Sequence, residues 1–405
     1  MADVAPVAEA RRIVSLDVMR GFAVLGILIV NAAFFAAPWQ ASQNPLLAPL
    51  AITDDTAWAW FSMHVFFEYK CITLFSLLFG ASLYLVGGER DDLERGAVLR
   101  RRLFWLLVFG LIHALFIWYG DILVIYALTG FLVLFVRSWT PRTLMIAGIV
   151  FYGLSLGLHS LFGLFFDHIP AAKLAEVKAE IWAPTPQTVD EVTAAYRGGL
   201  VAATTENMST WASFIQSAIT GIMVRTAGVM MIGMALFKWG FLSGNARLWL
   251  YVAALLLGGL ALAAIGYQAW INAQAGFAFS HMQRSGAGAN VALSIFVSIG
   301  YAALFVLLVK AGARVIVAPL AAVGRMAFTN YIAQSLVMTT IFWSGRGFGL
   351  FGEVDRITLY AIVLGVWIAQ LIWSPLWLSR FEMGPLEWVW RRLSYKRPVR
   401  MARPA

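Results

Sequence analysis

Long apolar blocks separated by short polar segments make up most of the chain. The first block runs from about Ile13 to Pro38, which is long enough to cross about 30 Å of hydrocarbon as a helix. Further blocks follow at about 60–87, 103–119, 121–136, 143–167, 209–237, 248–271, 291–309, 315–344 and 358–378. The pattern predicts an all-α, polytopic membrane bundle of about ten transmembrane helices, with a tight hairpin between the short third and fourth blocks.

Basic residues are distributed unevenly between these blocks. With the N-terminus in the cytoplasm, every inside segment contains Lys or Arg, and these segments are 1–12, 88–102, 137–142, 238–247, 310–314 and 379–405. The outside segments 38–59, 168–208, 272–290 and 345–357 hold fewer: Lys173, Lys178, Arg197, Arg284, Arg346 and Arg356. Because cytoplasmic loops of membrane proteins are enriched in Lys and Arg, we expect both termini in the cytoplasm.

We expect residues 1–405 to form a single transmembrane domain. Its N-terminal helices lie in 1–167 and its C-terminal helices in 209–405, and the loop 168–208 between them is outside the cytoplasm. No internal repeat and no pair of helices broken by Pro or Gly is visible. Both features mark many transporters, so their absence counts mildly against a transporter.

Composition supports the membrane assignment. Hydrophobic residues make up 61% of the chain and charged residues 13%, about half the usual charged share, which excludes a soluble enzyme, a disordered chain and a disulfide scaffold. The single cysteine, Cys71, excludes an intramolecular disulfide and a cysteine-based metal site. The net charge of +9 lies in short clusters between apolar blocks, so it indicates orientation in a lipid bilayer and not nucleic acid as a partner.

Polar residues inside the apolar blocks are costly and indicate either function or internal pairing. In the block 13–38, Asp17 and Arg20 are three residues apart and can pair on one face. Asn31 lies eleven residues after Arg20, on almost the same face and about 16 Å further along the helix. This stripe is either part of a functional site or a structural ion pair with one interhelical hydrogen bond.

The block 60–87 places His64 and Glu68 four residues apart, in the outer third of the membrane. A carboxylate beside an imidazole orients it and raises its basicity, although a helix-end pair facing interfacial water is an equally acceptable interpretation. Lys70 is expected to point away from Glu68 and to extend toward the membrane surface.

His113 lies within the block 103–119, among apolar neighbours, and Asp121 follows at the tip of the predicted hairpin. Asp121 either orients His113 or caps the N-terminus of the next helix. His113 is either a catalytic group or a core histidine bonded to a backbone carbonyl. The sequence leaves both alternatives open.

Two arginines complete the set of charged residues within the blocks. Arg225 lies near mid-membrane on a glycine-lined surface, where it requires an anion such as Glu68, Asp121 or a phosphorylated ligand. Arg325 lies nearer the cytoplasm, and Asn330 and Gln334 share a face further out. A basic inner vestibule below an outer cluster of His and carboxylate suits a cytoplasmic donor that carries phosphate.

Five segments resemble the YeiB family of bacterial integral membrane proteins: RRIVSLDVMRGFAVLGILIVN, KCITLFSLLFGASL, GLIHALFIWYGDILVIYALTG, GRMAFTNYIAQSL and SPLWLSRFEMGPLEWVWRRLSY. The last two resemble the family's C-terminal domain of unknown function. Together the segments extend across nearly the whole chain. The resemblance implies a multi-pass protein of the bacterial cytoplasmic (inner) membrane.

YeiB-like proteins are grouped with transmembrane acyltransferases, including heparan-α-glucosaminide N-acetyltransferase and the acyltransferase-3 family. The shared pattern LDxxRGxA is carried here by Leu16, Asp17, Arg20, Gly21 and Ala23. Such enzymes move acyl groups from cytoplasmic acyl-CoA to a glycan or related acceptor. Asn31 stands where acyltransferase-3 proteins have a functional histidine; the heparan enzyme also has asparagine at this position. In the heparan enzyme a catalytic histidine follows in the outside loop, but residues 32–63 of this chain contain no histidine.

The resemblance therefore implies an acyltransferase that uses acetyl-CoA or another acyl-CoA as donor and an unidentified acceptor. Arg20, Arg225 and Arg325 would attract the CoA phosphates, with Asn330 and Gln334 beside them. His113 or His64 would act as general base, oriented by Asp121 or Glu68, and Asn31 would donate to the thioester oxygen. No motif indicates a metal site, and a homodimer is left open as an assembly.

Two other functions remain. In a transporter or export factor for a small anionic metabolite, the same arginines would bind the substrate at mid-membrane and the histidines would carry protons. In an inactive relative that serves as a membrane partner, the absent loop histidine would need no replacement. Binding of CoA favours the enzyme, and uptake driven by a pH gradient favours the transporter.

Overall fold

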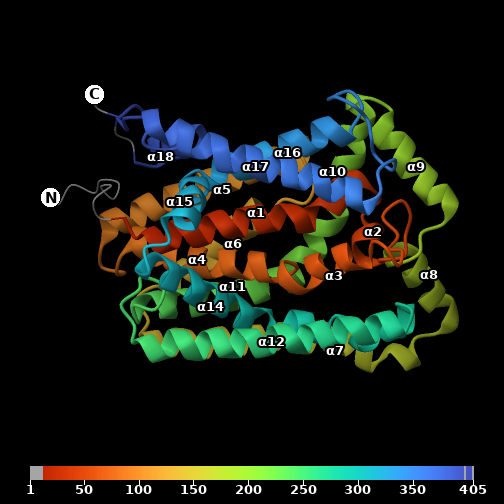
Figure 1. The fold of residues 1–405 in the computed structure, drawn as a ribbon, viewed down its shortest axis with the longest axis horizontal. Coiled ribbons are helices and arrows are strands. Elements are labelled where there is room, and N and C mark those ends of the chain that lie inside the picture. The colour runs from red at the N-terminus through yellow and green to blue at the C-terminus, as the bar shows by residue number, and fades with distance from the viewer. Residues whose placement is uncertain (1–11, 396–397, 404–405) are drawn as a thin grey trace.

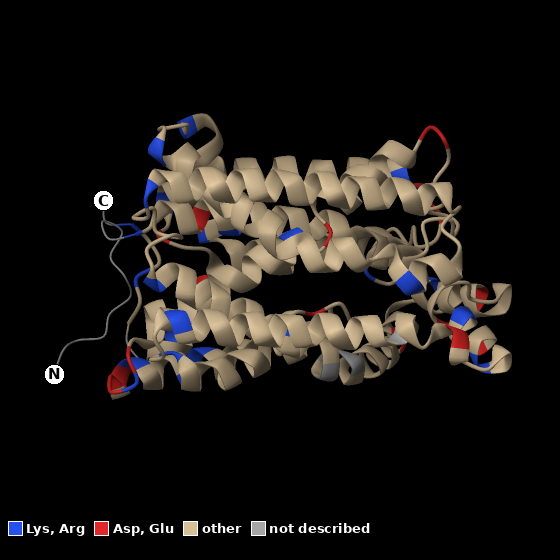
Figure 2. Cartoon of the chain, turned by 90° about the horizontal axis from the view of Figure 1, so that it is seen from below, with Lys and Arg blue, Asp and Glu red and all other residues tan. Residues whose placement is uncertain are grey.

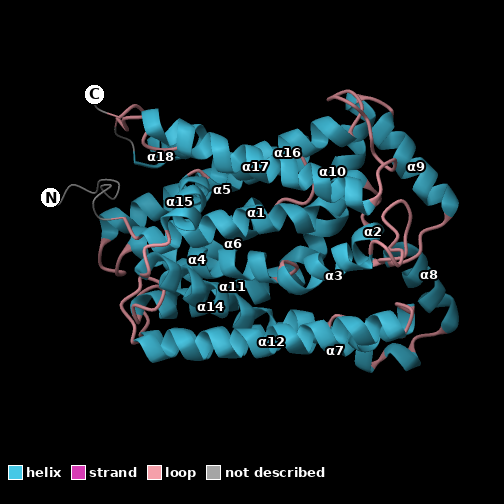
Figure 3. Ribbon diagram, in the orientation of Figure 1, coloured by secondary structure: helices cyan, strands magenta, loops and turns pink. Residues whose placement is uncertain are grey.

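The computed structural model describes residues 12–395 and 398–403. Within those ranges the chain is helical, and its only extended pairings are the isolated bridges Ser344–Gly347 and Phe381–Ala402. Figure 3 shows helices joined by loops. This confirms the all-α class.

The helices of the N-terminal half are α1 (Val14–Ala36), α2 (Gln40–Gln43), α3 (Ala57–Phe66), α4 (Lys70–Gly87), α5 (Leu93–Phe116), α6 (Leu123–Val133), α7 (Pro141–Leu164), α8 (Ala171–Ile181) and α9 (Pro186–Arg197). Those of the C-terminal half are α10 (Leu200–Ser217), α11 (Met223–Lys238), α12 (Leu248–Gln274), α13 (Phe279–His281), α14 (Gly288–Lys310), α15 (Arg314–Arg325), α16 (Ala327–Phe342), α17 (Arg356–Arg380) and α18 (Pro385–Tyr395). The longest of them lie side by side along one direction (Figure 1).

Six helical segments of the described residues are long and apolar enough to cross a membrane, which confirms a polytopic membrane protein. They are Val14–Ala36, Ala57–Gly87, Pro141–His168, Leu248–Gln274, Phe279–Lys310 and Arg356–Arg380. A seventh is obtained when the bent pair α15 and α16 is taken as one span.

This number is smaller than the ten apolar blocks, so the count of about ten is not confirmed. The difference lies in helices that are short or charged at one end. The first turns of α5 carry Arg95 and the run Arg100–Arg102, and α6 has 11 residues. A π-helical turn, Ala218–Ile222, separates α10 from α11, which has 16 residues.

Two of the long apolar segments are broken. Three non-helical residues separate α3 from α4, and the last of them, Tyr69, is left-handed with φ 62°. At Met326 the axes of α15 and α16 meet at 80°. Sequence analysis noted only the absence of helices broken by Pro or Gly, and neither break falls on such a residue, so the sequence carried no signal for them.

Glycines allow α1 and α15 to pack with their backbones in contact. A Cβ added at Gly21 would lie 1.9 Å from the Leu320 carbonyl oxygen, and one added at Gly324 would lie 1.8 Å from that of Asp17. Only residues without a side chain permit this approach. The close packing places Arg20 of α1 and Arg325 of α15 at the same end of the bundle.

Both ends of the described chain lie at the same end of the bundle, beside α15, α18 and the start of α1 (Figure 1). Lys and Arg gather at this end, together with a few acidic residues, and the opposite end, with α8 and α9, also carries both signs of charge (Figure 2). We refer to the end with the termini as the basic end. The arrangement agrees with the loop-charge pattern of the sequence.

Candidate functional site

A cavity of about 260 Å³ lies at the basic end of the bundle. Its lining on α1 runs from Ile13 to Ile27 along one helical face, so it extends roughly 20 Å into the bundle at 1.5 Å per residue. The walls are mainly apolar and come from α1, α4, α6 and α16, with residues such as Val24, Ile27, Phe75, Leu78, Phe79, Leu123 and Phe328. The cavity is therefore long and apolar inside.

Charged residues line the part of the cavity at the basic end. They are five arginines and two carboxylates: Arg12, Arg20, Arg102, Arg325, Arg391, Asp17 and Glu387. The positive charges exceed the negative ones, so this mouth attracts anions. Sequence analysis identified two of these arginines, Arg20 and Arg325, as donor-binding residues.

Two arginines of the mouth, Arg20 and Arg102, are held by defined contacts. Arg20 donates to Asp17 Oδ1 at 3.0 Å, which confirms the predicted pair, and to Ser82 Oγ at 2.8 Å. The Arg102 guanidinium lies 4.1 Å from the centroid of the Trp390 ring. Burial, together with the neighbouring positive charges of Arg102 and Arg12, lowers the pKa of Arg391 to about 10. Bringing an anion into the mouth would relieve this repulsion.

Glu387 joins α18 to the start of α16. Its Oε1 accepts the backbone N–H groups of Phe328, at 2.7 Å, and Thr329, at 3.1 Å, and its Oε2 accepts the Thr329 hydroxyl at 2.6 Å. These N–H groups belong to the first turn of α16 and have no partner within the helix. Burial raises the pKa of Glu387, although the bonds from Thr329 and Phe328 act in the opposite direction. One carboxylate of the mouth thus serves as a helix cap.

Beyond the inner end of the cavity, three polar side chains form a chain of hydrogen bonds. His113 Nδ1 lies 2.8 Å from Asp121 Oδ1, and His113 Nε2 lies 2.9 Å from Ser335 Oγ. Asp121 Oδ2 also accepts the backbone N–H of Val124 at 2.7 Å. Asp121 therefore both orients His113 and caps α6, so the two interpretations left open by the sequence are both correct.

The partners assign the proton on the imidazole. Asp121 Oδ2 accepts a backbone N–H, and a carboxylate that accepts at both oxygens would receive the hydrogen of His113 Nδ1 at Oδ1. In that tautomer Nε2 is the acceptor for the Ser335 hydroxyl. A base oriented by a carboxylate and bonded to a hydroxyl is the arrangement used for general-base chemistry.

Tyr331 connects this group with the cavity. It lines the cavity, and the centroid of its ring lies 5.2 Å from that of His113. Its hydroxyl donates to the Gly120 carbonyl at 3.5 Å. Ile122, next to Asp121 in the chain, also lines the cavity. The inner end of the cavity and His113 thus share the Tyr331 ring as a wall.

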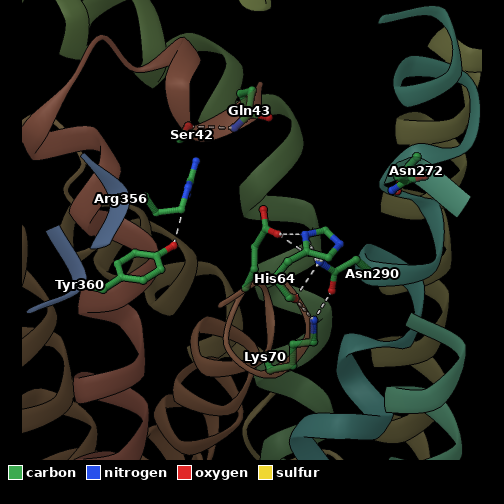
Figure 4. A network of polar contacts seen from close by, with 10 residues as sticks. Ser42, Gln43, His64, Lys70, Asn272, Asn290, Arg356 and Tyr360 are labelled. Atoms are coloured by element: carbon green, nitrogen blue, oxygen red, sulfur yellow. Dashed lines mark hydrogen bonds and ion pairs between the residues drawn. The ribbon is translucent and has the colours of Figure 1, made fainter. Parts of the chain in front are cut away.

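The second predicted histidine belongs to a separate cluster between α3 and α14 (Figure 4). His64 Nδ1 lies 2.5 Å from Glu68 Oε2, which confirms the predicted pair, and the His64 ring stacks on Trp60 with centroids 4.7 Å apart. Asn290 Nδ2 lies 3.2 Å from Glu68 Oε2. None of these residues lines the cavity at the basic end.

Lys70 also belongs to the His64 cluster, so the prediction that it extends to the membrane surface is wrong. Its side chain is buried with 0% exposure, and Nζ donates to the His64 carbonyl at 2.7 Å and to Asn290 Oδ1. The prediction assumed a continuous helix from His64 to Lys70. Because the helix breaks just before Lys70, the helical spacing does not hold there.

Arg225 contacts neither carboxylate expected for it. Its guanidinium donates to Thr73 Oγ1 at 2.7 Å and to Ser294 Oγ at 2.9 Å, and it lies 5.5 Å from the ring centroid of Tyr69. Hydroxyls and aromatic faces stabilise a guanidinium without a full counter-charge. Arg225 does not line the cavity at the basic end, so the expected phosphate partner is not supported there.

Three further predicted residues lie outside the cavity lining. Asn330 bonds to the Val323 carbonyl at 3.0 Å, and Gln334 bonds to Gln370 Oε1 at 2.8 Å, so both amides hold α16 against its neighbours. Asn31 is half-buried and makes no side-chain hydrogen bond with another described residue. The structure does not join these residues to His113 by any hydrogen bond.

Sequence analysis did not identify Ser335, Tyr331, Arg102, Arg391 or Glu387 as parts of a site. Tyr331 and Ser335 are four residues apart in the segment GRMAFTNYIAQS, so a helical projection could have placed them on one face. It could not have shown that this face meets α5. Among the described residues, no group of three His, Cys, Asp or Glu side chains is arranged to hold a metal ion.

Comparison with known proteins identifies a family and several relatives. Residues 236–397 match the family described as "Protein of unknown function (DUF418)". The chain is 34% identical to "Uncharacterized protein YeiB" of Escherichia coli (strain K12), over 97% of this chain and 98% of that protein. It is 31% identical to "Uncharacterized protein YxaH" of Bacillus subtilis (strain 168), over 98% of this chain and 97% of that protein. No solved structure matches the chain significantly.

Proposed function

The chain belongs to the YeiB family, and we propose that it is a membrane acyltransferase that moves an acyl group from cytoplasmic acyl-CoA to an acceptor in the membrane or beyond it. The observation that carries this proposal is the cavity at the basic end. It combines an arginine-lined mouth with a deep apolar interior that ends beside an oriented histidine. An acyl-CoA has the matching sequence of parts: an anionic nucleotide, a long flexible arm and an acyl group.

In this proposal the basic end faces the cytoplasm of a bacterial cell. The excess of Lys and Arg in the segments at this end supports that orientation. The chain would lie in the cytoplasmic (inner) membrane and cross it about ten times, with short helices such as α6 completing the bundle inside a shell of longer ones. Both termini would then be cytoplasmic.

The size of the cavity limits what it can hold. Pockets for drug-sized ligands measure about 300–1,000 Å³, so about 260 Å³ suits the acyl-pantetheine arm and not the whole coenzyme. The nucleotide and its phosphates would remain at the mouth. There Arg20, Arg325 and Arg391 present guanidinium groups, which bind phosphate through paired hydrogen bonds.

His113 would supply the base for the transfer. When a hydroxyl or amine attacks the thioester carbonyl carbon, a new bond to that carbon forms and the carbon–sulfur bond breaks. The proton of the attacking group passes to Nε2 and then to the departing thiolate, which leaves as CoA–SH. Asp121 stabilises the imidazolium that forms between these two transfers.

A specific observation also favours a second candidate, a transporter for a small anionic metabolite. Many secondary transporters bind substrate where spanning helices are broken, and the chain has such breaks at Tyr69 and Met326. The break before Lys70 lies within the cluster of His64 and Glu68. In this alternative the cluster would bind or relay protons.

Calorimetric titration of the detergent-purified protein with acetyl-CoA tests the donor site. Arg325→Ala should weaken binding by about tenfold or more, because a guanidinium–phosphate contact contributes roughly 1.5–3 kcal/mol. Arg314→Ala is the matched control, since Arg314 begins the same helix, is exposed and does not line the cavity. Its affinity should equal that of the wild type.

Absence of acetyl-CoA binding by folded wild-type protein would contradict the donor site. Equal loss of affinity in the two arginine variants would show that binding depends on the charge of the basic end and not on the cavity.

A further inference from the structure

Ser335 Oγ lies beside His113 Nε2, the ring nitrogen that would take a proton from an attacking group. His113 has two ring nitrogens, and both are engaged: Nδ1 with Asp121 and Nε2 with Ser335. An acceptor hydroxyl could reach Nε2 only after it displaced the serine. The proton nearest to the base is therefore that of Ser335.

The serine is also aligned for donation to the base. The distance from Ser335 Oγ to His113 Nε2 is 2.9 Å, whereas that to the Tyr331 carbonyl one turn earlier is 3.4 Å. A helical serine commonly bonds to such a carbonyl, but at 3.4 Å this contact is the weaker of the two. In the tautomer that places Nδ1–H toward Asp121, the hydroxyl hydrogen would point to Nε2, as an activated nucleophile requires.

We infer that Ser335 is the nucleophile that carries the acyl group between the donor and the acceptor. This inference rests on the proposed acyltransferase function and divides the transfer into two steps at one residue. It would explain how a protein with a donor cavity at one end can serve an acceptor that never enters that cavity.

Both steps balance. In the first, Ser335 Oγ attacks the thioester carbonyl, an oxygen–carbon bond forms, the carbon–sulfur bond breaks, and the serine proton passes through His113 to the leaving thiolate. In the second, the hydroxyl or amine of the acceptor attacks the acyl-serine and gives its proton to His113. His113 returns that proton to Ser335 Oγ as the ester bond breaks.

The placement of Ser335 fits the donor side. Tyr331 lies four residues earlier on the same face of α16 and lines the inner end of the cavity. Four helical residues correspond to about 6 Å, so a thioester at the inner end would lie about one turn from Ser335. The Tyr331 ring, which contacts both the cavity and His113, would have to move aside for the attack.

A serine-reactive probe tests the nucleophile independently of the donor. The purified full-length protein is treated with radiolabelled diisopropyl fluorophosphate, which forms an oxygen–phosphorus bond with an activated serine and releases HF. Wild-type protein should be labelled on the peptide that contains Ser335. Ser335→Ala should not be labelled. His113→Gln should be labelled at least about 100-fold more slowly than the wild type.

Ser298→Ala is the matched control, because Ser298 is also a buried helical serine but bonds only to backbone carbonyls of Lys70 and Ser294. It should react like the wild type. Circular dichroism in detergent and acetyl-CoA affinity show whether each variant is folded. Ser335→Ala should keep that affinity while it loses acetyl transfer, which a merely structural serine would not do.

The outcomes separate the inference from the proposed function. Labelling that misses Ser335, or that proceeds equally fast in His113→Gln, would overturn the nucleophile. Acetyl transfer at the wild-type rate by Ser335→Ala would overturn it as well and leave the acyltransferase standing. Absence of acetyl-CoA binding in the calorimetric test would contradict the acyltransferase, whichever residue the probe labels.

Discussion

Replacing His113 by Ala should reduce acetyl transfer by roughly 10²–10⁴-fold, the range that a positioned general base contributes. Both predicted histidines have a carboxylate partner, but only the buried His113 contacts the ring of Tyr331, which lines the cavity. The measurement is transfer of label from radiolabelled acetyl-CoA to acceptors of inverted membrane vesicles, normalised to the amount of folded protein.

His64→Ala is the control that decides between the two histidines. His64 lies in a different cluster, with Glu68 and Asn290, so its loss should change the transfer rate far less than the loss of His113. A fall of equal size in the folded His64 variant would contradict the assignment. Transfer that persists when both histidines are replaced would remove the proposed base altogether.

Gly324→Ala should be strongly destabilising and should also weaken acetyl-CoA binding. The added Cβ would lie 1.8 Å from the Asp17 carbonyl oxygen and 2.7 Å from the Gly21 nitrogen, both on the backbone of α1. Neither atom can yield by a change of rotamer, so α1 and α15 must separate. Overpacking of this kind costs about 1–3 kcal/mol, and we expect the upper end of that range.

The effect on binding follows because α1 and α15 carry Arg20 and Arg325 at the mouth of the cavity. Thermal unfolding in detergent measures the stability, and calorimetry measures the affinity. The matched control is Gly259→Ala on α12, where an added Cβ meets nothing within 4 Å. A stability loss in Gly324→Ala no larger than in Gly259→Ala would contradict the close packing of the two helices.

The sequence was sufficient for the class of protein and for contacts within one helix. Asp17 and Arg20 are three residues apart within α1, so helical spacing brings them together. Glu68 follows the end of α3, where its backbone N–H still bonds to the Met63 carbonyl, so it remains about one turn from His64. The long spans were predicted from the length of the apolar blocks. Such predictions depend only on residues that are neighbours in the chain.

Predictions that depended on an unbroken helix or on neighbouring helices were less successful. Lys70 turned inward because the chain leaves the helix just before it. Arg225 donates to hydroxyls on α4 and α14, whereas carboxylates were expected as its partners. That prediction failed because the sequence does not tell which helices are adjacent. The contact of His113 with Ser335 joins α5 to α16 and could not be predicted from spacing.

The central claim, that an acyl group passes from a cytoplasmic donor to an acceptor in the membrane or beyond it, is tested most directly with inverted vesicles. Their cytoplasmic face is outward, so acetyl-CoA labelled in both the acetyl and the CoA parts is added outside. We predict that the acetyl label becomes attached to acceptors in the membrane or the lumen while the CoA label stays outside. Entry of both labels together, or no acetyl label above that of vesicles lacking the protein, would contradict the account.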